Sequence, residues 1–100
     1  MKLIFSFALL VSFGSLSSFT HSSDIVVSVG EKLYKNYCTI CHGNNGKLSI
    51  GEAPDLTKST MNLKERISII KKGKGMMAPF QDLLSEKEIK AISKYTMTLQ

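Results

Sequence analysis

The sequence predicts a small all-α domain with three main helices joined by long loops. Three segments carry apolar residues at helical spacing, two of them start with a capping box, and no segment alternates as a strand does. The chain has 100 residues, of which 43% are hydrophobic, so it suits one small domain. A domain of this size usually needs a covalent staple or a cofactor to complete its core.

The N-terminus has the pattern of a signal peptide. Lys2 gives a positive start, and Leu3–Phe13 is an apolar run of the matching length. The run is too short and too rich in serine for a transmembrane helix, although an uncleaved anchor stays open as an alternative. We therefore expect residues 1–23 to be a signal peptide whose cleavage site is open, residues 24–100 to form the domain, and the protein to be periplasmic.

Two helices are predicted in the first two thirds of the domain. The first covers Val27–Tyr37, where apolar residues recur at helical spacing. The second covers Leu63–Lys72. Asn62 and Glu65 form its capping box, and Gly73 is a ready stop.

The third helix is predicted over Glu86–Leu99, behind a capping box made by Ser85 and Glu88. The loops that connect the three helices, residues 43–60 and 73–84, are rich in turn-forming residues. Loops this long in a compact domain usually carry function.

The chain's two cysteines stand in the motif C-x-x-C-H, as Cys38, Cys41 and His42. A disulfide across so short a loop would stabilise little. Zinc needs four ligands, and the other histidine, His21, lies at the predicted signal peptide. A thioredoxin-like dithiol needs strands that this sequence does not predict.

Covalent haem attachment explains the motif better than these alternatives. Thiols at positions i and i+3 can reach the two vinyl groups of a porphyrin, and His42 can then bind the iron as proximal ligand. This attachment happens outside the cytoplasm, which agrees with the export signal. The motif therefore predicts one haem c, bound through Cys38 and Cys41.

Two methionines, Met76 and Met77, precede the last helix in a glycine-rich loop. Methionines are often flexible apolar filler. A thioether is also a soft ligand for haem iron, and a methionine and a histidine together fill both axial positions. Iron ligated in this way is suited to electron transfer.

These motifs together resemble the small class I c-type cytochromes over residues 28–100. The resemblance implies that Gly30 and Tyr34 pack the first helix against Tyr95 of the last helix. It also implies that Pro54, twelve residues after His42, offers its backbone carbonyl to the histidine.

The same resemblance assigns the distal side of the haem site. Leu56 would line the haem wall. Counting three residues back from Phe80 selects Met77 as the axial ligand, although Ala78 and Pro79 stand in swapped order, and Met76 is the nearest competitor. Further apolar residues expected to keep water from the iron are Ile67, Ile70, Phe80 and Leu84.

The resemblance implies a one-electron carrier rather than an enzyme. The formal net charge is +5, and scattered lysines would steer a redox partner with an acidic docking surface. The lysines considered for this role are Lys35, Lys47, Lys71, Lys72 and Lys74. No motif or dense basic stripe indicates nucleic-acid binding, and membrane contact would come only through partner complexes or an uncleaved signal.

Two other functions stay open from the sequence. One is a c-type cytochrome subunit or domain dedicated to a single dehydrogenase or oxidase complex. The other, less favoured, is a haem protein with an open sixth site, such as a sensor or a peroxidase-like protein, which requires that neither Met76 nor Met77 binds iron.

Overall fold

The computed structural model describes residues 10–12, 14 and 21–100. Its elements in chain order are α1 (His21–Tyr37), α2 (Thr39–His42), η1 (Ile50–Glu52), η2 (Leu56–Lys58), α3 (Leu63–Lys72) and α4 (Glu86–Thr96), where η denotes a 3₁₀ turn. Across the described residues no strand forms, and the β-type pairing is one isolated bridge between Lys74 and Met77. The predicted all-α class is confirmed.

The predicted signal peptide lies mostly outside the described residues, which include only 10–12, 14 and 21–23 of residues 1–23. It therefore stays a prediction. In the part of the chain that is described, no helix has the length and apolar character needed to cross a membrane.

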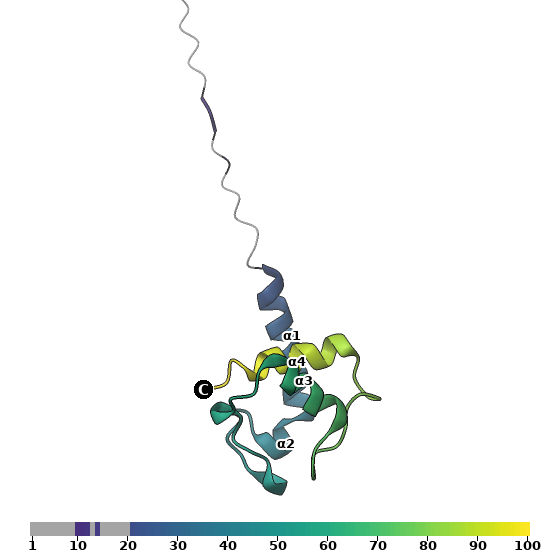
Figure 1. The fold of residues 1–100 in the computed structure, drawn as a ribbon. Helices are drawn as coiled ribbons and strands as arrows, with labels where there is room; N and C mark the ends of the chain where they lie inside the picture. Colours follow the sequence, from purple (N-terminus) through teal and green to yellow (C-terminus); the bar gives the residue numbers. More distant parts are fainter. Residues whose placement is uncertain (1–9, 13, 15–20) are drawn as a thin grey trace, which may run out of the picture.

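Helix α1 begins at His21, so the predicted start at Val27 is wrong by six residues. The added turns are mostly polar at their beginning, which is why apolar periodicity did not reveal them. Asp24 lies in the first turn, where a negative side chain interacts favourably with the positive end of the helix dipole. Figure 1 shows this start of α1 extending beyond the body formed by the other helices.

Helix α3 has the predicted bounds because both of its ends are specified locally. The Asn62 side chain accepts a hydrogen bond from the Glu65 amide (2.9 Å), and the Glu65 carboxylate accepts one from the Asn62 amide (2.8 Å). Gly73 ends the helix at φ 69°, a left-handed conformation that glycine adopts at little cost.

Helix α4 starts as predicted but ends at Thr96, so the predicted end at Leu99 is wrong. Its Ser85–Glu88 capping box forms, with distances of 3.2 and 2.9 Å. Beyond Thr96 the amides bond three residues back, and the Thr98 hydroxyl also donates to a carbonyl three residues back (2.7 Å). These tighter turns replace the last α-helical turn.

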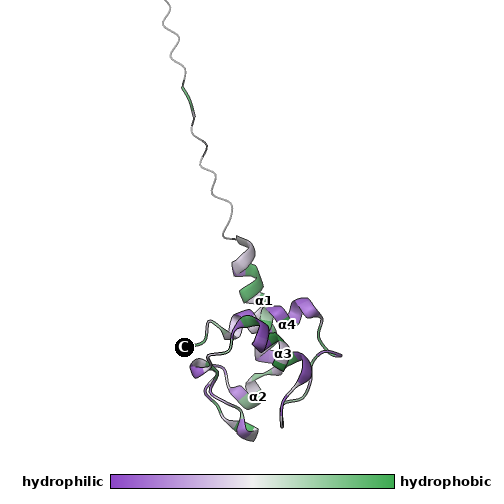
Figure 2. Ribbon diagram, viewed as in Figure 1, coloured by the Kyte–Doolittle hydropathy of each residue, from purple (hydrophilic) through white to green (hydrophobic). Residues whose placement is uncertain are grey.

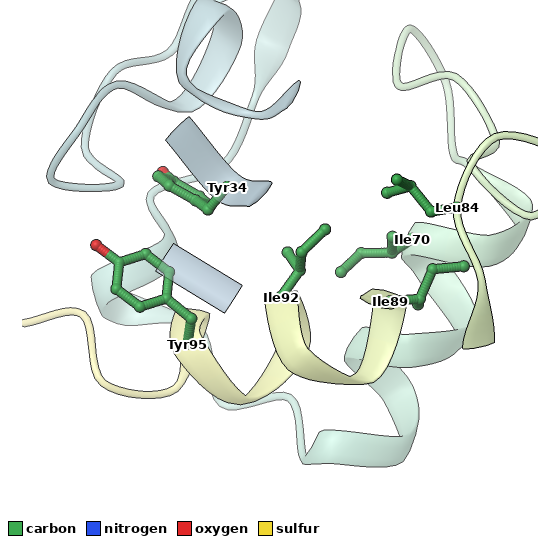
Figure 3. Close-up of a cluster of buried hydrophobic side chains, with 6 residues drawn as sticks. All are labelled: Tyr34, Ile70, Leu84, Ile89, Ile92 and Tyr95. Atoms are coloured by element: carbon green, nitrogen blue, oxygen red, sulfur yellow. The ribbon is translucent and has the colours of Figure 1, made fainter. Parts of the chain in front are cut away.

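The core is a short row of side chains along α4 (Figure 3). Tyr34 and Tyr95 lie at one end of the row, with ring centroids 5.2 Å apart. Ile92 lies in the middle, and three aliphatic side chains close the other end. These three are Ile70, Ile89 and Leu84. Figure 2 shows that polar segments lie along the outer part of α4 and that apolar segments lie where the helices meet.

Gly30 is the contact point between α1 and α4. A Cβ at this position would lie 2.6 Å from the Ala91 carbonyl carbon, closer still to its oxygen, and 3.0 Å from the Tyr95 Cβ. Only glycine permits the helices to approach this closely. The expected packing of Gly30 and Tyr34 against Tyr95 is therefore confirmed.

Candidate cofactor site

The C-x-x-C-H motif forms its own short helix, α2, directly after α1. The Cys38 amide donates to the Tyr34 carbonyl oxygen (2.9 Å), and the His42 amide donates to the Cys38 carbonyl oxygen (3.0 Å). This helical geometry separates Cys38 from Cys41 by about one turn. Both cysteines are free, Cys38 half-buried and Cys41 exposed. Each thiol is therefore available for a thioether.

The environment of these cysteines argues against a dithiol or a zinc site. Burial, helped by the neighbouring Cys41, raises the pKa of the Cys38 thiol to about 11. Redox-active thiols instead have a lowered pKa. Among the described residues no group of three or more His, Cys, Asp or Glu side chains could hold a metal ion.

His42 has one ring nitrogen that lacks a partner. Its Nδ1 is buried and makes no hydrogen bond of normal geometry to any residue that the structure describes. Burial lowers the pKa of His42, and the nearby Pro54 backbone carbonyl acts in the opposite direction. A metal-bound imidazole normally donates its other N–H to such an acceptor. The arrangement fits an iron ligand that binds through Nε2 and turns Nδ1 to Pro54.

The loop that brings Pro54 to His42 is held by backbone hydrogen bonds. The Leu48 amide donates to the His42 carbonyl oxygen (3.0 Å), and the Leu56 amide donates to the Gly46 carbonyl oxygen (2.9 Å). These bonds close residues 43–56 back onto α2. Leu56 is half-buried and packs against the core cluster.

The two methionines of the second loop face different surroundings. Met77 is half-buried and packs against the core cluster. Met76 is 78% exposed, and its sulfur lies 3.6 Å from the position that a Cβ on Gly51 would take. Met77 also pairs with Lys74, through hydrogen bonds of 3.1 and 3.0 Å, which fixes the turn before it.

An aromatic contact joins the methionine loop to the cysteine motif. The rings of Tyr37 and Phe80 lie 6.1 Å apart in an edge-to-face arrangement. Tyr37 directly precedes Cys38, and the Phe80 amide donates to the Ile70 carbonyl oxygen (3.0 Å). The loop containing Met77 is therefore anchored to α3 and to the end of α1.

The other expected wall residues divide into two groups. Ile67 and Phe80 are half-buried beside the core, whereas Ile70 and Leu84 are buried within it. Two of the five lysines considered for docking are already paired with carboxylates in the described chain. These pairs are Lys35–Glu31 (2.9 Å) and Lys71–Glu86 (3.1 Å).

Sequence reasoning expected one helical turn at the cysteines but did not give the bounds of α2, because four residues show no periodicity. It missed two contacts of the site. One is the hydrogen bond from the Tyr34 hydroxyl to the Gly43 carbonyl oxygen (2.7 Å), which joins α1 to the end of the motif. The other is the Tyr37–Phe80 contact, for which the sequence holds no signal beyond two aromatic residues.

An all-α domain with C-x-x-C-H at a short helix, a half-buried histidine whose Nδ1 lies near a backbone carbonyl, and a methionine packed against the same core defines a small c-type cytochrome. The comparisons agree. The family described as cytochrome c oxidase, cbb3-type, subunit III matches residues 26–95. The chain belongs to this family, and a c-type cytochrome implies covalently bound haem c.

Two similar proteins support the assignment. Quinohemoprotein alcohol dehydrogenase ADH IIB of Pseudomonas putida is 36% identical over 76 residues, covering 72% of this chain and 11% of that protein. The chain thus matches only about a ninth of that relative. The solved KustC0563 c-type cytochrome has a TM-score of 0.65 at 26% identity, covering 71% of this chain and 96% of that one.

Proposed function

We propose that this protein is a periplasmic one-electron carrier with a single haem c. Cys38 and Cys41 would bind the haem, with His42 and Met77 as its axial ligands. The haem supplies a one-electron couple between ferric and ferrous iron. The observation that carries the proposal is that half-buried Met77 packs against the same core cluster as Cys38, in a chain of a cytochrome family.

The side chains around the site have separate tasks. The Pro54 carbonyl would hold the His42 ring in the tautomer that leaves Nε2 free for iron. Leu56 and Phe80 would exclude water from the ligand side, and the Tyr37–Phe80 contact would keep the methionine loop in place. His42 and Met77 would together occupy both axial positions of the iron and would leave no open position for a small-molecule substrate.

Burial favours Met77 over Met76 as the ligand. A ligand inside the domain needs a side chain that turns toward the core, and Met77 packs there. Met76 is largely exposed and lies over Gly51, on the opposite loop. Met76 would then help close the gap between the two loops rather than bind iron.

A second function is favoured by the comparisons. The chain resembles about one ninth of a quinohemoprotein alcohol dehydrogenase, and its family is described as subunit III of an oxidase. A cytochrome of this kind would serve one dehydrogenase or oxidase complex instead of diffusing between partners. Lys72 and Lys74 form no ion pair within the described chain, so they suit an acidic partner in either case.

The deciding experiment is expression of the full chain together with c-type maturation machinery. We expect the product in the periplasmic fraction, shorter by its signal peptide and heavier by one haem. The ferric protein should show the weak far-red band of methionine–iron ligation. Rapid carbon monoxide binding by the ferrous protein, without that band, would overturn the carrier function.

Variants of the haem-binding residues test the site directly. Cys38→Ala and Cys41→Ala should each weaken covalent attachment, and His42→Ala should abolish a stable haem protein. Co-purification with a dehydrogenase or oxidase at fixed stoichiometry would replace the diffusing carrier by the dedicated subunit.

A further inference from the structure

Arg66 is a buried cation without a carboxylate partner. It lies on α3, is 9% exposed, and belongs to neither ion pair of the described chain. Its three hydrogen bonds go to neutral oxygens. Nε donates to the Met61 carbonyl (2.9 Å), Nη2 to the Ser59 carbonyl (3.3 Å) and Nη1 to the Thr96 hydroxyl (3.1 Å). The guanidinium is therefore held in place, and no carboxylate of the described residues pairs with its charge.

A buried charge of this kind normally costs free energy unless a counter-ion is present. The hydrogen bonds here join α3 to the end of α4 and to the segment before α3. A neutral donor could make similar contacts without the cost of burying a charge. Hydrogen bonding alone therefore does not explain why a charged side chain is buried at position 66.

Arg66 lies near the candidate site. It stands one turn before Ile70, which belongs to the core against which Met77 packs. Gly73, which follows the end of α3, lies so close to the Met77 carbonyl that no side chain would fit. Since a helix rises 1.5 Å per residue, the Arg66 backbone lies roughly 10 Å along the helix axis from Gly73, where the methionine loop begins.

We propose that Arg66 raises the reduction potential of the bound haem through its uncompensated buried charge. This inference rests on the proposed function, because it requires a haem that takes up and releases one electron. The oxidised site carries one more positive charge than the reduced site. A cation fixed inside the protein therefore disfavours the oxidised form, and solvent screens it less than it screens surface lysines.

Coulomb's law gives the size of the effect. For a charge taken to lie about 12 Å from the iron, and an effective dielectric constant of about 20–40, the redox equilibrium constant changes by roughly threefold to tenfold. For a one-electron couple this corresponds to a shift of about 28–59 mV.

The test compares variants of the full, haem-loaded protein by redox titration at fixed salt. Arg66→Gln should lower the potential by the amount above, and Arg66→Lys, which keeps the charge, should change it by less than half as much. Lys72→Gln removes an exposed cation from the same helix and should have a smaller effect than Arg66→Gln. Equal shifts for Arg66→Gln and Arg66→Lys, or none for Arg66→Gln, would overturn the inference.

A second pair of variants keeps Arg66 and its place in the fold. Thr96→Asp sets a carboxylate against Nη1 and should lower the potential toward that of Arg66→Gln. Thr96→Asn has nearly the same shape without charge and should leave the potential close to wild type. The inference is wrong if these two variants have the same potential, and this comparison stands even if Arg66→Gln does not fold.

Failure here is distinct from failure of the proposed function. A wild-type chain that acquires no haem, or whose haem lacks methionine ligation, contradicts the proposed function. A haem-loaded wild type with its methionine ligand, but with potentials insensitive to the charge at positions 66 and 96, contradicts only the role of Arg66.

Discussion

Replacing Gly30 by alanine should force α1 and α4 apart. The added Cβ would lie 2.6 Å from the Ala91 carbonyl carbon and closer still to its oxygen. Carbon atoms in contact normally lie about 3.5–4.0 Å apart, so the helices would have to separate by roughly 1 Å. The clashing group is backbone, so no rotamer change in a neighbouring side chain can relieve it.

Two opposing terms set the size of the effect. Alanine is better than glycine inside a helix by about 1 kcal/mol. Overpacking costs about 1–3 kcal/mol, and we take the upper value of about 3 kcal/mol because the obstacle is a carbonyl rather than a flexible side chain. The net loss is then about 2 kcal/mol, which corresponds to a fall in Tm of roughly 8–16 °C for a domain of this size.

The measurement is thermal unfolding of the haem-loaded protein followed by circular dichroism. Ser28→Ala is the matched control, because Ser28 is an exposed residue of the same helix. Its effect should stay within about 0.5 kcal/mol of wild type. A Gly30→Ala protein as stable as this control would refute the close approach of the two helices.

Three more predictions concern the ligand, a buried tyrosine and a helix cap. Met77→Ala should remove the far-red band and lower the reduction potential while sparing attachment, whereas Met76→Ala should keep both; the reverse result would exchange the two assignments. Burial raises the pKa of Tyr34 to about 12, so its protonated form stabilises the fold below pH 10 and this contribution is lost as the pH rises through 12. The free energy of unfolding, measured by urea titration, should fall less between pH 10 and pH 12 for Tyr34→Phe than for wild type. An equal fall with pH in the two proteins would contradict this. Ser85→Ala should lower the free energy of unfolding by about 0.5–2 kcal/mol through loss of its cap, and an unchanged urea midpoint would contradict the capping role.

Local sequence signals predicted those parts of the fold that local interactions determine. The capping boxes at Asn62 and Ser85 set the starts of α3 and α4, and Gly73 set the end of α3. The end of α4 was misjudged because Thr98 forms short-range hydrogen bonds that an apolar pattern does not report. The start of α1 was misjudged because polar residues form its first turns.

The candidate site shows a different limit. Spacing placed Cys38, Cys41 and His42 within one turn of helix, since residues so close in sequence have little freedom. It could not place Pro54 against His42, because residues 43–56 reach that position through loop hydrogen bonds. The pairing of the Pro54 carbonyl with His42 was predicted from family resemblance, and the role of Pro54 in the site stays a prediction.

Different parts of this cytochrome stabilise the fold and would set the reduction potential of the haem. The α1–α4 contact at Gly30 and the tyrosine pair hold the domain together, whereas the methionine loop is tied down mainly at Phe80 and at the Lys74–Met77 bridge. A change at Gly30 should therefore lower stability with little effect on the ligand spectrum. A change at Met77 should alter the spectrum and the potential with a smaller effect on stability. Parallel loss of both properties in either variant would mean that framework and ligand loop form one cooperative unit.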